Sequence, residues 1–183
     1  MFELIKGIDI ATEQFILSMH NLAFDKIFNL ITQFGGTVFS ALVFVAICYF
    51  LWREQRSFLG YFMSIFVINE ILTFLIKVGI GRQRPLGSLK YLEFNGSMPS
   101  GHVTASMFLY GYICFLIYRL WPSTSRFRST LILALILAIV LIGFSRLYLD
   151  VHYLSDVLVG FVIGGASLYT VIKLSPKKEE KNR

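Results

Sequence analysis

The stretch STLILALILAIVLIGFSR, residues 129–146, decides the class of this fold. Its residues run without a charge from Leu131 to Phe144, and its length approaches the ~20 residues that cross a hydrocarbon core of ~30 Å as a helix. Four further apolar runs resemble it, at residues 37–52, 57–77, 103–121 and 155–174. Hydrophobic residues make up 56% of the 183-residue chain, more than a soluble domain of this size can bury. We therefore expect an all-α fold, a polytopic transmembrane helix bundle.

The first 34 residues have a different pattern. Their apolar residues recur every three or four positions, with charged residues such as Lys6, Asp9 and Glu13 between them, as in amphipathic helices. We expect one or two helices that lie in the plane of the membrane interface. The alternative, a sixth span, would carry these charges into lipid or into the bundle interior. We expect an amphipathic N-terminal region over 1–34, a transmembrane domain of about five to six spans over 35–174, and a basic cytoplasmic tail over 175–183.

The charges predict an orientation in the membrane. The net charge is +6, but the basic residues form short clusters between apolar runs, which fits membrane topology and not nucleic-acid binding. The tail and five arginines fall on the side that the positive-inside rule makes cytoplasmic: Arg53, Arg56, Arg119, Arg126 and Arg128. The connections 78–101 and 147–154 then face outward. Cys48 and Cys114 lie inside apolar runs. We therefore expect them to act as small buried hydrophobic residues and not to form a disulfide or a metal site.

The outer side of the bundle collects polar residues from across the sequence. Three of them are cations whose donors suit phosphate oxygens: Lys77, Arg84 and Arg146. The stretch PSGH, residues 99–102, opens an apolar run, and the N–H groups at a helix N-terminus bind anions. Gly101 allows a ligand to approach the backbone closely, and Ser100 adds a hydroxyl donor. These residues predict a phosphate site at the outer end of the bundle.

Two histidines on this side fit the chemistry of phosphoryl transfer. His152 and Asp156 are four residues apart, so they share one face if a helix begins near His152. A carboxylate on Nδ1 sets the tautomer and aims Nε2, while His102 is placed to protonate a leaving oxygen. Because side chains supply the cations, we expect neither a metal nor another cofactor. We interpret Arg82 as a headgroup contact or as a residue without a role, and Asp150 as solvated or interfacial.

The same residues resemble the three signature motifs of the type 2 phosphatidic acid phosphatase (PAP2) family. KVGIGRQRP, residues 77–85, has the pattern Lys, six residues, Arg-Pro. PSGH is the second motif, and SRLYLDVHYLSD, residues 145–156, has the pattern Ser-Arg, five residues, His, three residues, Asp. Every defined position is filled, and the resemblance covers about residues 35–174. Family members usually have six spans, and we expect the first to be missing or shortened in this chain.

The resemblance implies roles for the residues at the motif positions. His152 would be the nucleophile that forms a phosphohistidine, Asp156 its orienting partner and His102 the general acid. The remaining positions would bind the phosphate of the substrate: Lys77, Arg84, Ser100, Gly101 and Arg146.

These roles lead to one favoured function and two alternatives. The favoured function is a lipid phosphatase of a bacterial plasma membrane, with its active site on the extracytoplasmic face. Its partners would be membrane lipids, and its substrate undecaprenyl pyrophosphate, phosphatidylglycerophosphate or phosphatidic acid. One alternative is a lipid phosphotransferase, in which the same phosphohistidine passes its group to another headgroup instead of water. The other is a lipid-binding or flipping protein, which would need no nucleophile.

Overall fold

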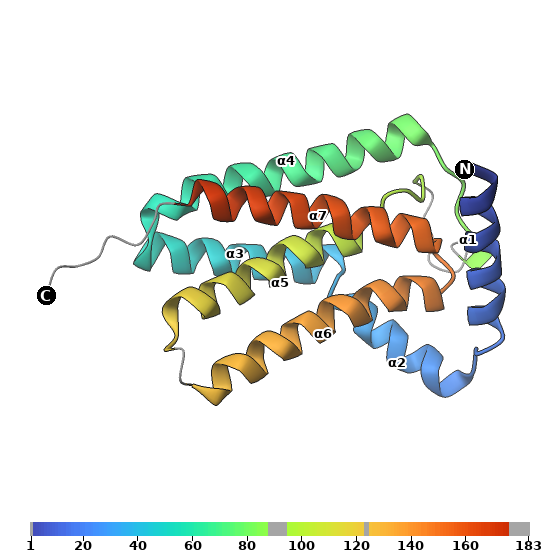
Figure 1. The fold of residues 1–183 in the computed structure, drawn as a ribbon, viewed down its shortest axis with the longest axis horizontal. Helices are drawn as coiled ribbons and strands as arrows, with labels where there is room; N and C mark the ends of the chain where they lie inside the picture. The colour runs from blue at the N-terminus through green and yellow to red at the C-terminus, as the bar shows by residue number, and fades with distance from the viewer. Residues whose placement is uncertain (1, 88–94, 123–124, 176–183) are drawn as a thin grey trace, which may run out of the picture.

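Seven helices make up most of the residues that the computed structural model describes, which are 2–87, 95–122 and 125–175. In chain order they are α1 (Phe2–Leu17), α2 (Leu22–Gln33), α3 (Thr37–Glu54), α4 (Arg56–Ile80), α5 (Gly101–Leu120), α6 (Arg126–Tyr148) and α7 (Leu154–Leu174). Helices α3 to α7 run along the long axis of the molecule, and α1 lies across one end of them (Figure 1). The predicted tail over 175–183 lies outside the described residues except for Ser175.

The predicted all-α transmembrane bundle is confirmed. Helices α3 to α7 match the five apolar runs to within three residues at either end. The described residues contain five stretches that are long and apolar enough to cross a membrane, and the first, Leu22–Glu54, joins α2 to α3. A helix satisfies its own backbone hydrogen bonds, which is what a segment surrounded by lipid requires. The chain is an integral membrane protein.

Helix α5 forms the centre of the bundle. The other helices bury 56% of the most apolar stretch of α5, whereas the corresponding share is 28% or less for each of the other candidate spans. It packs closely against α7, where Gly160 and Gly164 face it. A Cβ on Gly160 would lie 3.1 Å from the carbonyl oxygen of Ser100, so these glycines let the two backbones approach. This contact places the start of α7 beside the start of α5.

The amphipathic N-terminal region forms two helices, within the expected one or two. Asn21 caps α2, since its side chain accepts hydrogen bonds from the N–H groups of Ala23 and Phe24. Helix α1 packs its buried Ile16 against Tyr148 and its neighbours at the end of α6. Helix α1 therefore covers the end of the bundle at which α4 and α6 finish and α5 and α7 begin, and α2 runs back from that end beside α6 (Figure 1).

Candidate active site

The three sequence motifs meet at the end of the bundle that α1 covers. The first lies where α4 ends, the second where α5 begins, and the third between the end of α6 and the start of α7 (Figure 1). His102 lies within electrostatic range of four residues from the other two motifs: Arg146, His152, Lys77 and Arg84. Residues that are up to 79 positions apart, from Lys77 to Asp156, therefore form one polar cluster.

The first motif places Arg84 against the third. Gly81 ends α4 in a left-handed conformation, with φ of 57°, so the chain leaves the helix one turn after Lys77. Arg84 then donates from Nε to the carbonyl oxygen of Asn95 at 2.7 Å and from Nη1 to that of Val151 at 2.9 Å. These two bonds hold its guanidinium beside His152.

The surroundings of His152 define its tautomer. Arg84 Nη1 lies 3.1 Å from Nε2, and Asp156 Oδ2 lies 3.5 Å from Nδ1. A guanidinium can only donate, so Nε2 accepts and the ring proton resides on Nδ1, facing the carboxylate. The predicted pairing of His152 with Asp156 is therefore present, although α7 begins two residues later, at Leu154. Its Nε2 lies against the guanidinium of Arg84, a proposed phosphate ligand, which is where a nucleophilic nitrogen is required.

The second motif supplies an anion-binding helix start. Ser100 is the N-cap of α5, but its hydroxyl makes no capping hydrogen bond. Its Oγ is fully buried and has no hydrogen-bond partner among the described residues. Buried hydroxyls usually have one, so Ser100 Oγ is available to a bound ligand. The first N–H groups of α5, beginning at Gly101, also have no acceptor within the helix.

Arg146 completes the ring of cations from the end of α6. Its side chain is 3% exposed, and its Nη1 donates to Thr32 Oγ1 of α2 at 2.8 Å. Thr32 itself is buried. This contact from the N-terminal region was not anticipated, because nothing in the sequence links positions that are 114 residues apart.

The interpretation of Arg82 as a headgroup contact or a residue without a role was wrong. Its guanidinium binds Asp9 of α1 and Asp156 of α7, each at 2.7 Å. Burial alone would lower the pKa of Arg82, but the hydrogen bonds and charges of the two carboxylates outweigh it and raise that pKa. Asp9 was missed too, although it is seven residues from the buried Ile16 and so shares its helix face.

The interpretation of Asp150 as solvated or interfacial was also wrong. Asp150 is 8% exposed, and its Oδ2 accepts a hydrogen bond from the backbone N–H of Gly87 at 2.8 Å. It adopts a left-handed conformation with φ of 54°, one that aspartate tolerates better than most residues. Asp150 therefore ties the segment that follows the first motif to the turn between α6 and α7.

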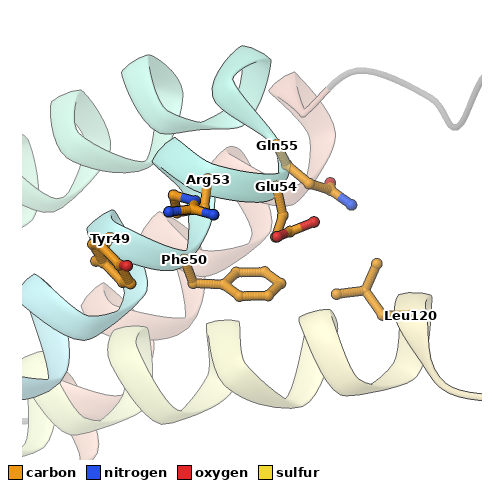
Figure 2. Close-up of a pocket in the computed structure, with 6 residues that line it drawn as sticks. All are labelled: Tyr49, Phe50, Arg53, Glu54, Gln55 and Leu120. Carbon is orange, nitrogen blue, oxygen red and sulfur yellow. The ribbon is translucent and has the colours of Figure 1, made fainter.

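A pocket at the opposite end of the bundle contains none of these residues. It has a volume of about 540 Å³ and lies where α3 ends near the end of α5. Figure 2 shows its lining residues, with Phe50 directed toward Leu120, and Arg53 and Glu54 on the last turn of α3. Without a histidine or a ring of cations, this pocket is not the candidate active site.

Comparison with known proteins identifies relatives of this chain. The model of the PAP2 superfamily matches residues 58–180. Phosphatidylglycerophosphatase B of Bacillus subtilis (strain 168) is 30% identical over 135 residues, which are 73% of this chain and 66% of that protein. The aligned region thus spans just under two thirds of the relative.

Two crystal structures share the fold. The first transmembrane PAP2-type phosphatidylglycerolphosphate phosphatase from Bacillus subtilis superposes with a TM-score of 0.84 at 24% identity, over 98% of this chain and 90% of that one. LpxE of Aquifex aeolicus superposes with a TM-score of 0.66 at 20% identity, over 90% of this chain and 94% of that one.

Proposed function

Because the chain belongs to the PAP2 superfamily, we propose that it is a metal-independent lipid phosphatase that works through a phosphohistidine at His152. The observation that carries the proposal is the pair of contacts at this imidazole. Arg84 Nη1 is 3.1 Å from Nε2, and Asp156 Oδ2 is 3.5 Å from Nδ1. One nitrogen thus faces a phosphate-binding cation, and the other faces a carboxylate that stabilises positive charge on the ring.

The reaction has two steps. In the first, His152 Nε2 attacks the phosphorus, the bond to the lipid oxygen breaks, and His102 donates a proton to that oxygen. In the second, water attacks the phosphohistidine while His102 takes up a proton, and inorganic phosphate leaves. The proposed ligands of the phosphate oxygens are Lys77, Arg84, Ser100, Gly101 and Arg146. Their charges and dipoles are in place before the reaction and stabilise its transition state.

The proposed substrate is a lipid phosphomonoester or pyrophosphate. A bundle of transmembrane helices brings the active site to the depth of lipid headgroups, so the substrate can remain in the membrane. Similarity to phosphatidylglycerophosphatase B favours phosphatidylglycerophosphate among the three candidate lipids. Undecaprenyl pyrophosphate and phosphatidic acid offer the same terminal phosphate with different leaving groups.

The proposed location is a bacterial plasma membrane, with the active site on the extracytoplasmic face. The arginines Arg53, Arg119 and Arg126 lie at the end of the bundle opposite the motifs, as the positive-inside rule requires for that orientation. Helix α1, at the other end, would then lie in the outer interface. The proposed units remain the N-terminal region 1–34, the transmembrane domain 35–174 and the basic tail 175–183.

Phosphate release by the purified protein in detergent micelles tests the function. We expect inorganic phosphate from at least one of the three lipids and none from the same lipid with His152→Gln. His20→Gln is the matched control, because His20 is exposed and stacks on Tyr148 outside the site. It should retain wild-type turnover.

Two other outcomes have separate meanings. If the folded wild-type protein releases phosphate from none of the lipids and transfers it to no other lipid, the proposal of a phosphatase is wrong. If the phosphate moves to a second lipid headgroup and not to water, the protein is a phosphotransferase with the same intermediate.

A further inference from the structure

The Arg82 guanidinium connects helix α1 to the start of α7. Its Nη2 donates to Asp9 Oδ2 at 2.7 Å, and its Nη1 donates to Asp156 Oδ1 at 2.7 Å and to Ser155 Oγ at 2.6 Å. The ring of Tyr153 lies against the guanidinium, 4.2 Å from Cζ. Contacts on both edges and one face therefore leave Arg82 little freedom to move.

The side chain of Asp9 hydrogen-bonds to Ser155 and Arg82. Oδ1 accepts from the backbone N–H of Ser155 at 2.9 Å, and Oδ2 accepts from Ser155 Oγ at 2.6 Å and from Arg82. The residue is 2% exposed. A buried carboxylate is costly unless it is paired and hydrogen-bonded, so this position on α1 requires its partners.

These contacts determine which oxygen of Asp156 faces the imidazole. Arg82 holds Oδ1, while Oδ2 accepts from the backbone N–H of Tyr153 at 2.9 Å and lies 3.5 Å from His152 Nδ1. The carboxylate is fully buried. Loss of the bond at Oδ1 would allow it to rotate away from His152, and misplacement by about 1 Å can cost ~10²-fold in rate.

Asp9 also sets the charge that His152 experiences. Asp9, Arg82 and Asp156 together carry one net negative charge, which favours the positive charge that develops on the imidazole when Nε2 is phosphorylated. Without the carboxylate of Asp9, the charge of Arg82 would cancel that of Asp156. The cluster would then be neutral.

We propose that Asp9 is a positioning residue for the reaction at His152. Through Arg82 it holds Asp156 Oδ2 against Nδ1, and it preserves the negative charge that the nucleophile needs. This inference rests on the proposed function. It extends the active site beyond residues 58–180, the part that matches the family, into the first helix of the chain.

Other charged groups also surround His152 and remain in place in the test. From the remaining elements they are Lys77, Arg84, His102, Arg146, Asp150 and Glu13. All of them are retained in Asp9→Asn, but the pKa of Glu13, which the charge of Asp9 helps to raise, would fall. Asp9→Asn keeps the shape of the side chain and an oxygen for the N–H of Ser155, and it removes only the charge and part of the hydrogen bonding.

Kinetics on p-nitrophenyl phosphate and on phosphatidylglycerophosphate in micelles test the effect on turnover. We expect Asp9→Asn to lower kcat by roughly 10- to 100-fold with little change in KM. The acidic limb of the kcat/KM profile should move to lower pH, because an imidazole beside a neutral cluster is harder to protonate. Asp25→Asn on α2 removes the same charge from the N-terminal region but contacts Tyr148, not the site, and should retain wild-type kinetics. A loss of activity without the shift of the acidic limb would overturn the proposal.

Histidine-specific ¹⁵N labelling gives a readout that needs no turnover. The chain has only three histidines, so His152→Gln assigns the resonance of His152. The pH midpoint of its chemical-shift titration should fall in Asp9→Asn and rise in Arg82→Gln. In the double variant, whose cluster again carries one negative charge, this midpoint should return toward the wild-type value. General loosening of the fold cannot produce shifts of opposite sign.

The two readouts separate the inference from the function. Unchanged midpoints in both single variants would overturn the positioning role, even if the wild-type enzyme releases phosphate. The expected shifts in a protein that releases no phosphate would instead overturn the proposed function and leave the coupling of Asp9 to His152 in place.

Discussion

Arg146 of the third motif donates a hydrogen bond to Thr32 in α2, with 2.8 Å between Nη1 and Oγ1 and both side chains buried. A hydrogen bond to a charged group contributes about 1.5–3 kcal/mol to stability. Helix α2 therefore positions the guanidinium of Arg146, which we propose to bind phosphate, through a hydrogen bond to Nη1.

Replacement of Thr32 tests this contact. Thr32→Val keeps the shape of the side chain and removes the hydroxyl, so we expect the free energy of unfolding to fall by about 1.5–3 kcal/mol and inhibition by inorganic phosphate to weaken. Thr32→Ser retains a hydroxyl and should stay close to wild type in both measurements. Equal phosphate inhibition in wild type and Thr32→Val would separate α2 from the phosphate site.

The two histidines should differ in their dependence on the leaving group. A lipid alkoxide needs a proton when it leaves and p-nitrophenolate does not, so His102→Ala should lose ~10²–10⁴-fold on a lipid monoester and less on p-nitrophenyl phosphate. A pyrophosphate lipid should fall between them, and His152→Ala should be inactive on every substrate. The quantity to compare is kcat/KM, since His102 can also contact the bound phosphate.

Two results would contradict these assignments. Equal losses for His102→Ala on all three substrates would make His102 a phosphate ligand and not the acid. Measurable turnover by folded His152→Ala would remove the covalent mechanism.

Activity should not depend on a metal ion. The proposed phosphate ligands are cationic side chains and a helix N-terminus, which already supply the positive charge that a metal would bring. We expect full activity in EDTA and inhibition by vanadate, which mimics the five-coordinate transition state. Activity lost in EDTA and restored by Mg²⁺ would be incompatible with this mechanism.

We expect the stability of the fold to depend on pH through Glu13 of α1. Burial raises the pKa of Glu13, and the nearby carboxyl of Asp150 raises it further. A carboxyl group whose pKa is higher in the folded state destabilises the fold once pH rises above its unfolded pKa, because it then resists ionisation. Glu13→Gln should therefore raise Tm at neutral pH and have no such effect in acid, where Glu13 is already neutral. A lower Tm for Glu13→Gln at neutral pH would refute this account.

Cysteine labelling tests the proposed orientation in the membrane. In a background of Cys48→Ala and Cys114→Ala, Leu86→Cys places a thiol at a residue that is 81% exposed at the end that carries the motifs. Pro122→Cys places one at the exposed opposite end. In intact cells we expect an impermeant maleimide to label position 86 and not 122. The reverse pattern would turn the active site toward the cytoplasm.

The sequence alone determined the helices and indicated the residues of the candidate site. A membrane span can be recognised from its length and apolar composition, because in lipid the backbone of a segment can hydrogen-bond only within a helix. Helix α6 accordingly matches the apolar run 129–146. The motif residues could be assigned to one end of the bundle because each sits where an apolar run starts or stops. The apolar runs and the positions of the motifs at their ends are both local features of the sequence, so they can be recognised without the tertiary fold.

Only the tertiary structure decided what supports those residues. Arg82 and Asp9 are 73 positions apart, and Arg146 and Thr32 are 114 apart. Each pair forms because amphipathic helices pack across the end of the bundle, a placement that no spacing in the sequence encodes. Amphipathicity predicted that one face of α1 avoids water, but not whether lipid or protein covers it. Protein covers part of this face. For that reason Asp9, which was expected at the membrane surface, is buried close to Asp156, the partner of the proposed nucleophile.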